Sequence, residues 1–398
     1  MYIPEEVNYI IETLNNNNFE AFVVGGCVRD SIMGMTPKDY DIATSATPLN
    51  IKPLFKKTVD TGINHGTITV VLNKNNYEVT TYRIDGDYND CRRPKEVYFT
   101  TKLEDDLVRR DFTINAIAYH KNVGFIDPYR GIEDITIKCI RGVGDPNKRF
   151  QEDALRMLRA IRFSSQLDFD VEPITYKALL DNAHLISNIS VERIRDELNK
   201  TFLGKNLTKA LLIIESNILK YISPNLNNYL QTYLEKSIGY MAKADFSIID
   251  RLVILFRYLN SEEVINFMKL LKYSNQEIKQ VTILHKYTYF NIQDNVYSVR
   301  KTMSILGKDL FFNLIKIKEV LGQDIININF LGRDVISNND PLIISDLDIN
   351  GNILKKNNIC EGKEIGRVLD GLLDLVLMDP KLNKESILLD NCYKLLDK

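Results

Sequence analysis

Short apolar runs separated by turn residues characterise the first third of the chain. The runs lie at residues 21–24, 40–43, 67–72, 77–83 and 112–119. They are rich in the Val, Ile, Thr and Tyr that favour strands, and the polar stretch 73–76 between two of them is typical of a hairpin turn. Apolar residues recur at helical spacing in 5–15, and 28–33 favours a short helix. This part is predicted to mix strands and helices.

From about Asn147 onward the apolar residues follow a helical period instead. The predicted helices cover residues 151–163, 190–203, 205–222, 246–259, 261–272, 275–287, 296–306, 308–321 and 363–378. Strand patterns nearly vanish, and the stretch 131–144 contains the predicted boundary. The pattern therefore predicts an α+β protein, in which a mixed head is followed by helices alone.

Composition narrows the class of protein. The 398 residues are 44% hydrophobic and 26% charged, and the net charge of −2 excludes a uniformly basic coat but allows a local basic groove. No apolar run approaches the roughly 18 residues of a membrane span. The N-terminal residues are acidic where a signal peptide would be basic, and the five scattered cysteines form no Cys-x-x-Cys pair. We expect a cytoplasmic protein with reduced thiols and no membrane partner.

Arginine is distributed unevenly in a chain that otherwise favours lysine. Thirteen arginines lie between Arg83 and Arg195, and only five follow from Arg251 onward. The planar guanidinium fits phosphates and base edges, whereas lysine offers a point charge. The stretch is predicted to bind a nucleotide or nucleic acid, and the alternative is a set of surface salt bridges.

The pair Asp39 and Asp41 is the first candidate for chemistry. Asp-x-Asp on a strand places both carboxylates on one face, where a divalent cation such as Mg²⁺ relieves their repulsion. The preceding Gly25 and Gly26 allow backbone N–H groups to approach a triphosphate, and Arg29 can neutralise its charge. We predict a nucleotidyl-transfer site, with Asp39 and Asp41 as catalytic metal ligands. The alternative is an exposed turn.

These residues also resemble a known family. Residues 24–30 with 39–41 are similar to the polymerase-β-type head of class II (bacterial-type) tRNA nucleotidyltransferases, the CCA-adding enzymes, and of the related bacterial poly(A) polymerases. Residues 85–94 resemble the family's flexible loop, 109–116 its ribose-selecting motif and 152–159 its base-selecting motif. Supporting motifs match at 127–128 with Gly131 and at 192–197. The resemblance covers about residues 20–200 and matches the remainder loosely.

The resemblance implies an organisation and further site residues. It implies a polymerase-β-type head over residues 1–142, a helical neck over 143–205, a helical body over 206–325 and a tRNA-facing helical tail over 326–398. It also implies that Arg110 contacts the nucleotide, and it makes Asp111 a candidate partner of the ribose hydroxyl.

Asp153 and Arg156 are predicted to select the base. Three positions apart on one helix, they offer an acceptor and a donor side by side. Cytosine and adenine present the complementary amino group and ring nitrogen, whereas uracil and guanine are mismatched and leave buried polar groups unpaired. The alternative is a plain helix salt bridge. Arg159 and Arg162 continue at spacing three and are expected to contact phosphates or brace the pair, or else to lie on a solvated face.

The expected activity is the addition of C, C and A to the tRNA 3′ acceptor end from CTP and ATP. Two Mg²⁺ ions on Asp39 and Asp41 would assist, and pyrophosphate would leave. Addition of CC only, addition of A only and poly(A) synthesis remain alternatives on the same head. The complete motif at 85–94 favours A addition, and the absence of a basic C-terminal run disfavours poly(A) synthesis.

Two alternatives belong to other classes. A catalytically silent RNA-binding protein on the same fold would be expected to lose one of the two aspartates, and both are present. Nucleotidyl transfer to a small molecule would not need the Asp153–Arg156 pair or the long helical region. The role of Glu78 and the oligomeric state, including a homodimer, stay open at this stage.

Overall fold

The computed structural model describes residues 1–86 and 96–396. It divides into two compact units, Met1–Glu235 and Lys236–Lys398. The finer division into head, neck, body and tail stays a prediction. Among the described residues, no helix is both long and apolar enough to cross a membrane.

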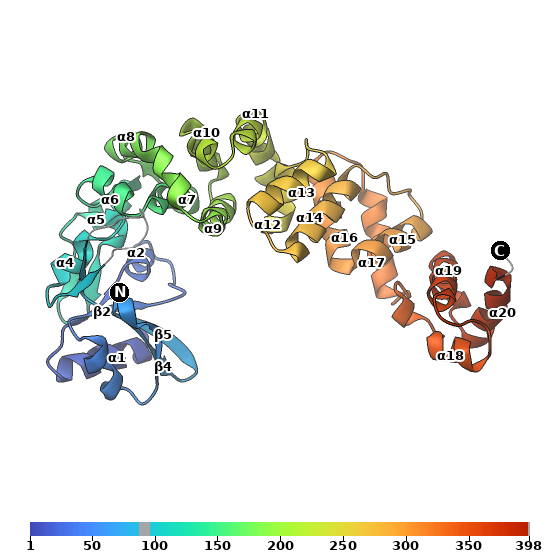
Figure 1. Cartoon of the computed structure of the whole chain (residues 1–398), viewed down its shortest axis with the longest axis horizontal. Coiled ribbons are helices and arrows are strands. Elements are labelled where there is room, and N and C mark those ends of the chain that lie inside the picture. Colours follow the sequence, from blue (N-terminus) through green and yellow to red (C-terminus); the bar gives the residue numbers. More distant parts are fainter. Residues whose placement is uncertain (87–95, 397–398) are drawn as a thin grey trace. The chain divides into compact units, whose positions relative to one another are not determined.

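A mixed sheet lies in the N-terminal part of the first unit (Figure 1). Its strands, in spatial order, are β3 (Thr58–Gly62), β4 (Thr67–Leu72), β5 (Asn75–Thr81), β2 (Asp41–Thr44), β1 (Ala21–Val24), β8 (Ala118–His120) and β9 (Gly124–Ile126). All four residues of β1 are buried, as expected of an unbroken apolar run in a central strand. Strand β2 lies parallel to β5, and the other neighbours are antiparallel. The predicted hairpin and the strands at 21–24, 40–43 and 67–72 are confirmed to within a residue. In the run 112–119 only the last two residues belong to a strand, because Thr113–Asn115 forms a 3₁₀ turn.

Two smaller strand pairs lie outside this sheet. Strand β6 (Arg83–Asp85) pairs with β7 (Val97–Phe99), and β10 (Cys139–Ile140) pairs in parallel with β11 (Asp170–Val171). Because β11 follows a long helix, it is a small exception to the predicted all-helical region. It ties the segment after that helix to the end of the predicted head.

Short helices cover the sheet of the first unit. They are α1 (Glu5–Asn16), α2 (Gly26–Ile32), α3 (Pro48–Ile51), α4 (Leu103–Val108) and α5 (Gly131–Thr136), with 3₁₀ turns at Lys52–Leu54, Ile63–His65 and Thr113–Asn115. The buried face of α1 consists of the apolar residues at helical spacing, Val7, Ile10, Ile11 and Leu14. The sequence pattern therefore identified this face correctly.

Helices form the rest of the first unit, and the last of them continues past Glu235, where this unit ends. They are α6 (Pro146–Glu152), α7 (Leu155–Leu167), α8 (Pro173–Asn182), α9 (Val191–Phe202), α10 (Leu212–Glu215) and α11 (Pro224–Met241), with 3₁₀ turns at Ala183–Asn188, Leu207–Leu211 and Ile218–Tyr221. Helix α7 packs against α9. A Cβ atom on Gly204, just after α9, would lie 2.0 Å from the Ser165 Oγ atom of α7, so only glycine permits this approach.

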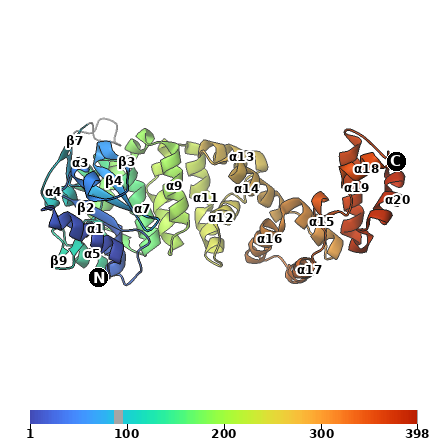
Figure 2. The same cartoon turned by 90° about the horizontal axis from the view of Figure 1, so that it is seen from below.

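The described part of the second unit is helical (Figure 2). Its helices are α12 (Ile248–Leu255), α13 (Ser261–Leu270), α14 (Asn275–Thr288), α15 (Val296–Leu306), α16 (Lys308–Val320), α17 (Ile326–Ser337), α18 (Gly351–Lys356), α19 (Glu364–Met378) and α20 (Glu385–Leu396), with 3₁₀ turns at Ile344–Asp346 and Pro380–Leu382. Reciprocal capping boxes start α12, α13 and α14, at Ser247, Asn260 and Ser274. The predicted α+β class, with helices after the head, is confirmed.

Candidate active site

The two predicted metal ligands lie at one end of β2. Asp41 is the first residue of the strand, whereas Asp39 precedes it, so the expectation that both lie on a strand is wrong for Asp39. Asp41 is the register partner of Glu78 on the parallel strand β5. Asp39, Asp41 and Glu78 all line a cavity of about 580 Å³. Glu78, whose role the sequence left open, therefore lies beside the predicted metal ligands.

Crowding makes these carboxylates difficult to ionise together. Burial raises the pKa of Asp41, Arg110 opposes this effect, and Asp39 adds to it. Burial also raises the pKa of Glu78, and the charges of Asp41 and Asp39 raise it further. A divalent cation would relieve this repulsion.

The described residues hold no cluster of three or more His, Cys, Asp or Glu side chains arranged for a metal ion. The protein therefore offers a pair of carboxylates and not a closed cage. Mg²⁺ commonly binds through one or two carboxylates together with substrate phosphates. The donor set at Asp39 and Asp41 fits such an ion.

The Gly25–Gly26 turn brings the backbone close to the arginines. Gly25 has a φ of +81°, and a Cβ atom there would lie 2.8 Å from the Arg110 Nη1 atom. The backbone conformation therefore favours glycine, and a Cβ atom would also displace the Arg110 guanidinium. Gly26 is the first residue of α2, and Arg29 follows within the same helix.

Most of the predicted nucleotide-binding residues line one cavity of about 450 Å³. The predicted residues in its wall are Gly26, Arg29, Asp41, Arg110, Asp153, Arg156 and Arg159. The cavity thus brings the glycine turn and one metal ligand together with the base-selecting residues. Arg162 lies outside this wall: its Nε donates to the Glu197 carboxylate at 2.6 Å, so it is paired and not on a solvated face.

Asp153 does not share a helix with Arg156, and this part of the prediction is wrong. Helix α6 ends at Glu152, Asp153 is extended with φ −136° and ψ 102°, and α7 begins at Leu155. The Asp153 carboxylate accepts the Leu155 backbone N–H at 3.1 Å and an Arg193 N–H at 3.0 Å. A short acidic side chain that binds a nearby backbone N–H competes with helix continuation. The alternative of an Asp153–Arg156 salt bridge is also not observed.

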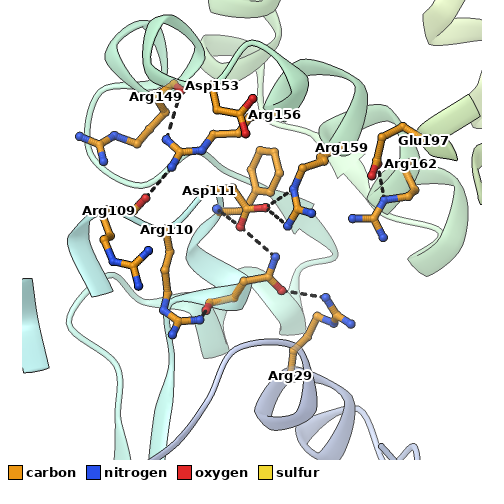
Figure 3. Close-up of polar contacts among 12 residues, drawn as sticks. Arg29, Arg109, Arg110, Asp111, Arg149, Asp153, Arg156, Arg159, Arg162 and Glu197 are labelled. Carbon is orange, nitrogen blue, oxygen red and sulfur yellow. Dashed lines mark hydrogen bonds and ion pairs between the residues drawn. The ribbon is translucent and has the colours of Figure 1, made fainter. Parts of the chain in front are cut away.

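Arg156 is held by other partners, as Figure 3 shows in part. It donates to the Glu152 carboxylate at 2.8 Å, to the Arg109 carbonyl at 2.7 Å and to the Arg149 carbonyl at 3.1 Å. These contacts leave its Nε hydrogen and one Nη2 hydrogen unused among the described residues. Arg156 is therefore fixed in place with donors to spare for a base.

A chain of hydrogen bonds connects α2 with α7 (Figure 3). Arg29 donates to the Asn115 side chain at 2.7 Å, Asn115 donates to Asp111 at 3.0 Å, and Arg159 Nε donates to Asp111 at 2.8 Å. Although burial alone would raise it, Arg159 and Asn115 hold the pKa of the Asp111 carboxyl well below its usual range. Asp111 is thus ionised, and it is already occupied by protein donors.

Some residues of the site were not singled out from the sequence. Asn115, Phe163 and Arg193 line the cavity, and Glu197 pairs with Arg162. Asn115 and Glu197 lie within quoted motifs, whereas Phe163 had no pattern of its own beyond an apolar helix position. Residues 87–94 of the predicted flexible loop lie outside the described residues, so that prediction remains as it was.

Comparison with known proteins places the chain in a family. Residues 21–141 match the model of the poly A polymerase head domain, 168–230 that of a probable RNA and SrmB-binding site of polymerase A, and 248–392 that of tRNA nucleotidyltransferase domain 2. The CCA-adding enzyme of Pediococcus pentosaceus is 36% identical over 99% of this chain and 98% of its own length. This chain belongs to the CCA-adding enzyme family.

Other CCA-adding enzymes agree with this assignment. That of Ligilactobacillus salivarius is 36% identical over 100% of this chain and 98% of its own. The crystal structure of the Bacillus stearothermophilus CCA-adding enzyme in complex with CTP superimposes with a TM-score of 0.83, at 29% identity and with all of both chains covered. The Thermotoga maritima CCA-adding enzyme complexed with tRNA shares the fold, with a TM-score of 0.59 at 21% identity. The polymerase-β-type head expected of CCA-adding enzymes is thereby confirmed.

Proposed function

We propose that this chain adds C, C and A to the 3′ end of tRNA from CTP and ATP and releases pyrophosphate. One observation carries the proposal: Asp153 and Arg156 line the same cavity as Asp41, Gly26 and Arg29. A nucleotide whose base meets Asp153 and Arg156 can therefore direct its phosphates toward the carboxylates. The full-length similarity to CCA-adding enzymes supports the same activity.

Asp39 and Asp41 are the proposed metal ligands, with Glu78 beside them. Mg²⁺ bound there would supply a Lewis acid that activates the terminal ribose hydroxyl and stabilises the leaving pyrophosphate. The carboxylates themselves position that ion at the end of β2, next to Gly25 and Gly26. Burial raises the pKa values of Asp41 and Glu78, the neighbouring carboxylates raise them further, and a bound dication would favour the ionised forms.

Asp153 and Arg156 take the place of a nucleic-acid template. The carboxylate accepts from the exocyclic amino group of C or A, and the guanidinium donates to the adjacent ring nitrogen. Arg193 and Glu152 fix the two side chains before a nucleotide arrives. A base with the opposite donor pattern would leave buried groups unpaired, and its incorporation is penalised accordingly.

The remaining predicted site residues have two proposed roles. Gly26, Arg29, Arg110 and Arg159 line the cavity and receive the phosphates and ribose. Arg162 braces α7 against α9 through Glu197. The helical part of the chain would bind the acceptor arm of tRNA mainly through phosphates and A-form shape. We place the protein in the cytoplasm, in keeping with the free thiols of Cys27, Cys139, Cys360 and Cys392.

The test uses three tRNA transcripts that end before CCA, after C and after CC. Each is incubated with Mg²⁺ and labelled CTP or ATP, alone and together, and products are resolved at single-nucleotide length. Stepwise addition of C, C and A that then stops is the expected result. A stop after CC, or use of the CC-ended transcript only, would assign a partial enzyme. A long ladder of A would indicate a poly(A) polymerase, and no incorporation would overturn the proposal.

A further inference from the structure

One aromatic ring in the candidate site lies among three arginines. The guanidinium carbons of Arg162, Arg29 and Arg159 lie 4.0, 5.2 and 5.3 Å from the centroid of the Phe163 ring. All three distances are within the roughly 6 Å at which a cation is attracted to an aromatic face. Arg29 comes from α2, whereas Arg159, Arg162 and Phe163 belong to α7.

The ring is itself held firmly. Phe163 is 6% exposed, and its ring meets that of the fully buried Phe112 edge to face, with centroids 5.8 Å apart and planes at 83°. It also forms part of the wall of the cavity that Arg29 and Arg159 line. The ring is therefore a fixed surface, and it restricts the positions of the guanidinium groups that contact it.

An aromatic ring suits a phosphate site better than another acid would. Each of the three arginines already has one carboxylate partner. Arg29 pairs with Asp30, Arg159 with Asp111 and Arg162 with Glu197. A further carboxylate between them would cancel their charge and compete with an incoming phosphate. The face of a ring attracts guanidinium groups through its quadrupole and adds no net charge. The arginines can thus be ordered while the cavity stays attractive to anions.

We propose that Phe163 is a positioning residue that orders Arg29 and Arg159 to receive the phosphates of the incoming nucleotide. This inference rests on the proposed function and names a further residue on which that function depends. The hydrogen-bonded chain through Asn115 and Asp111 contacts the same two arginines. The ring and the chain together set the spacing between α2 and α7.

The inference separates phosphate binding from base selection. Asp153 pairs with Arg193, and Arg156 pairs with Glu152. Among the described contacts, the Arg156 guanidinium does not lie over the Phe163 ring. Loss of the ring should therefore weaken the binding of CTP and of ATP by the same factor, because both nucleotides carry a triphosphate. The preference for CTP over UTP should not change.

The test compares two changes at Phe163 with the same changes at Phe169. Phe163→Leu removes the aromatic face, and replacement of Phe163 by 3,4,5-trifluorophenylalanine keeps the shape while weakening the quadrupole. Phe169 is also buried, at 2% exposure, and no arginine lies over its ring among the described contacts. Thermal unfolding is recorded for every variant, and the fluorinated ring decides the outcome if the leucine variant does not fold.

At Phe163 we expect KM for CTP and for ATP to rise by a common factor of about ten, which corresponds to about 1.4 kcal/mol. The kcat value and the preference for CTP over UTP should be unchanged, and Phe163→Tyr should restore KM. The Phe169 variants should keep the KM values of the unmodified protein, whatever stability they lose. Calorimetric binding of CTP without tRNA should show the same loss of affinity.

Four results would overturn the inference. They are an unchanged KM with the fluorinated ring, a loss confined to kcat, a loss of base preference, and equal effects at Phe163 and Phe169. If the unmodified protein incorporates nucleotides normally while one of these results is obtained, only the role of Phe163 fails. If the unmodified protein neither binds CTP nor incorporates it, the proposed function fails as well.

Discussion

The carboxylates at the end of β2 and the arginines of the neighbouring cavity differ in whether their charges are paired. At the end of β2, Asp39, Asp41 and Glu78 have no hydrogen-bonded or ion-paired cation among the described side chains, and the pKa values of Asp41 and Glu78 are raised. In the neighbouring cavity the arginines have carboxylate partners, as Arg159 does in Asp111. One end is a repulsive arrangement that needs an ion, and the other is already balanced.

The difference suggests which part of the site is complete in the protein alone. A preorganised donor and acceptor pair costs little reorganisation when a base arrives. Asp153 and Arg156 are held in this way by Arg193 and Glu152. Asp39, Asp41 and Glu78 have no comparable hydrogen-bonded partners among the described side chains. The proposed base-selecting pair is therefore held in place by the protein alone, whereas the proposed metal ligands would be completed only by a bound cation.

The largest effect should follow from removing the carboxylate end. Asp39→Ala combined with Asp41→Ala should lower CTP incorporation by about a thousandfold or more, because metal ions supply several kcal/mol of transition-state stabilisation. Single-turnover incorporation measures this loss, and tRNA binding should be retained. Asp60→Asn is the control, since Asp60 lies on β3 of the same sheet and pairs with Lys52 at 2.9 Å. Full activity of the double variant would contradict the metal assignment.

A smaller effect is expected at the balanced end. Asp153→Ala should reduce the preference for CTP over UTP by about 5- to 150-fold, which corresponds to 1–3 kcal/mol for a lost base contact. Values of kcat/KM for both nucleotides on one tRNA transcript measure the preference. Asp196→Ala removes a carboxylate that pairs with Arg195 and should leave the preference intact. An unchanged preference in Asp153→Ala would show that the base is read elsewhere.

Asp111 in the arginine-lined cavity should make the free energy of unfolding depend on pH. The pKa of Asp111 lies below its unfolded value, so ionised Asp111 stabilises the fold above about pH 4 and loses this effect as the pH falls further. Asp111→Asn should lower the free energy of unfolding by about 2–3 kcal/mol at pH 7, less than for a fully buried pair because Arg159 is partly exposed.

Chemical denaturation at pH 7, 5 and 3.5 provides the measurement. The difference between Asp111→Asn and the unmodified protein should shrink toward the lowest pH. Asp196→Asn breaks an exposed pair and should have little effect at any pH. A penalty for Asp111→Asn that stays constant down to pH 3.5 would argue against an ionised Asp111.

The smallest expected effect is a stabilisation of the fold. Asp41 and Glu78 face each other across β2 and β5, and like charges in such a position cost about 0.2–1 kcal/mol. Glu78→Gln should therefore raise the free energy of unfolding of the metal-free protein. Denaturation in EDTA and in Mg²⁺ measures the change, and Mg²⁺ should stabilise the variant less than the unmodified protein. Destabilisation of the variant in EDTA would show that the two ends of the site do not differ as described.

The sequence predicted the residues of the site better than their pairings. Most of the head strands, the helical face of α1 and the placement of Gly26, Arg29 and Asp153 around one cavity agree with the structure. The partners were not predictable, because they come from distant segments. Arg159 reaches Asp111 across 48 residues, and Arg193 reaches Asp153 across 40.

The helical period also gave wrong helix boundaries where a side chain interrupts a helix, and it missed a helix whose apolar residues lie on more than one face. The period through 151–163 predicts one helix, but the Asp153 carboxylate takes the Leu155 N–H and α6 ends before it. Helix α17 was not predicted, because it exposes Ile326 and Phe330 while it buries Ile328 and Val335. Apolar residues on more than one face give no clear helical stripe.

The parallel pair of β10 and β11 has a consequence for exchanging parts between relatives. It joins residue Ile140 to Val171, and the Thr175 hydroxyl accepts the Gly142 backbone N–H at 3.0 Å. A fragment cut between residues 142 and 143 would lose both contacts and expose a strand edge. A chimera that inherits its nucleotide site from another enzyme should therefore be joined after α9, so that each parent contributes intact secondary structure.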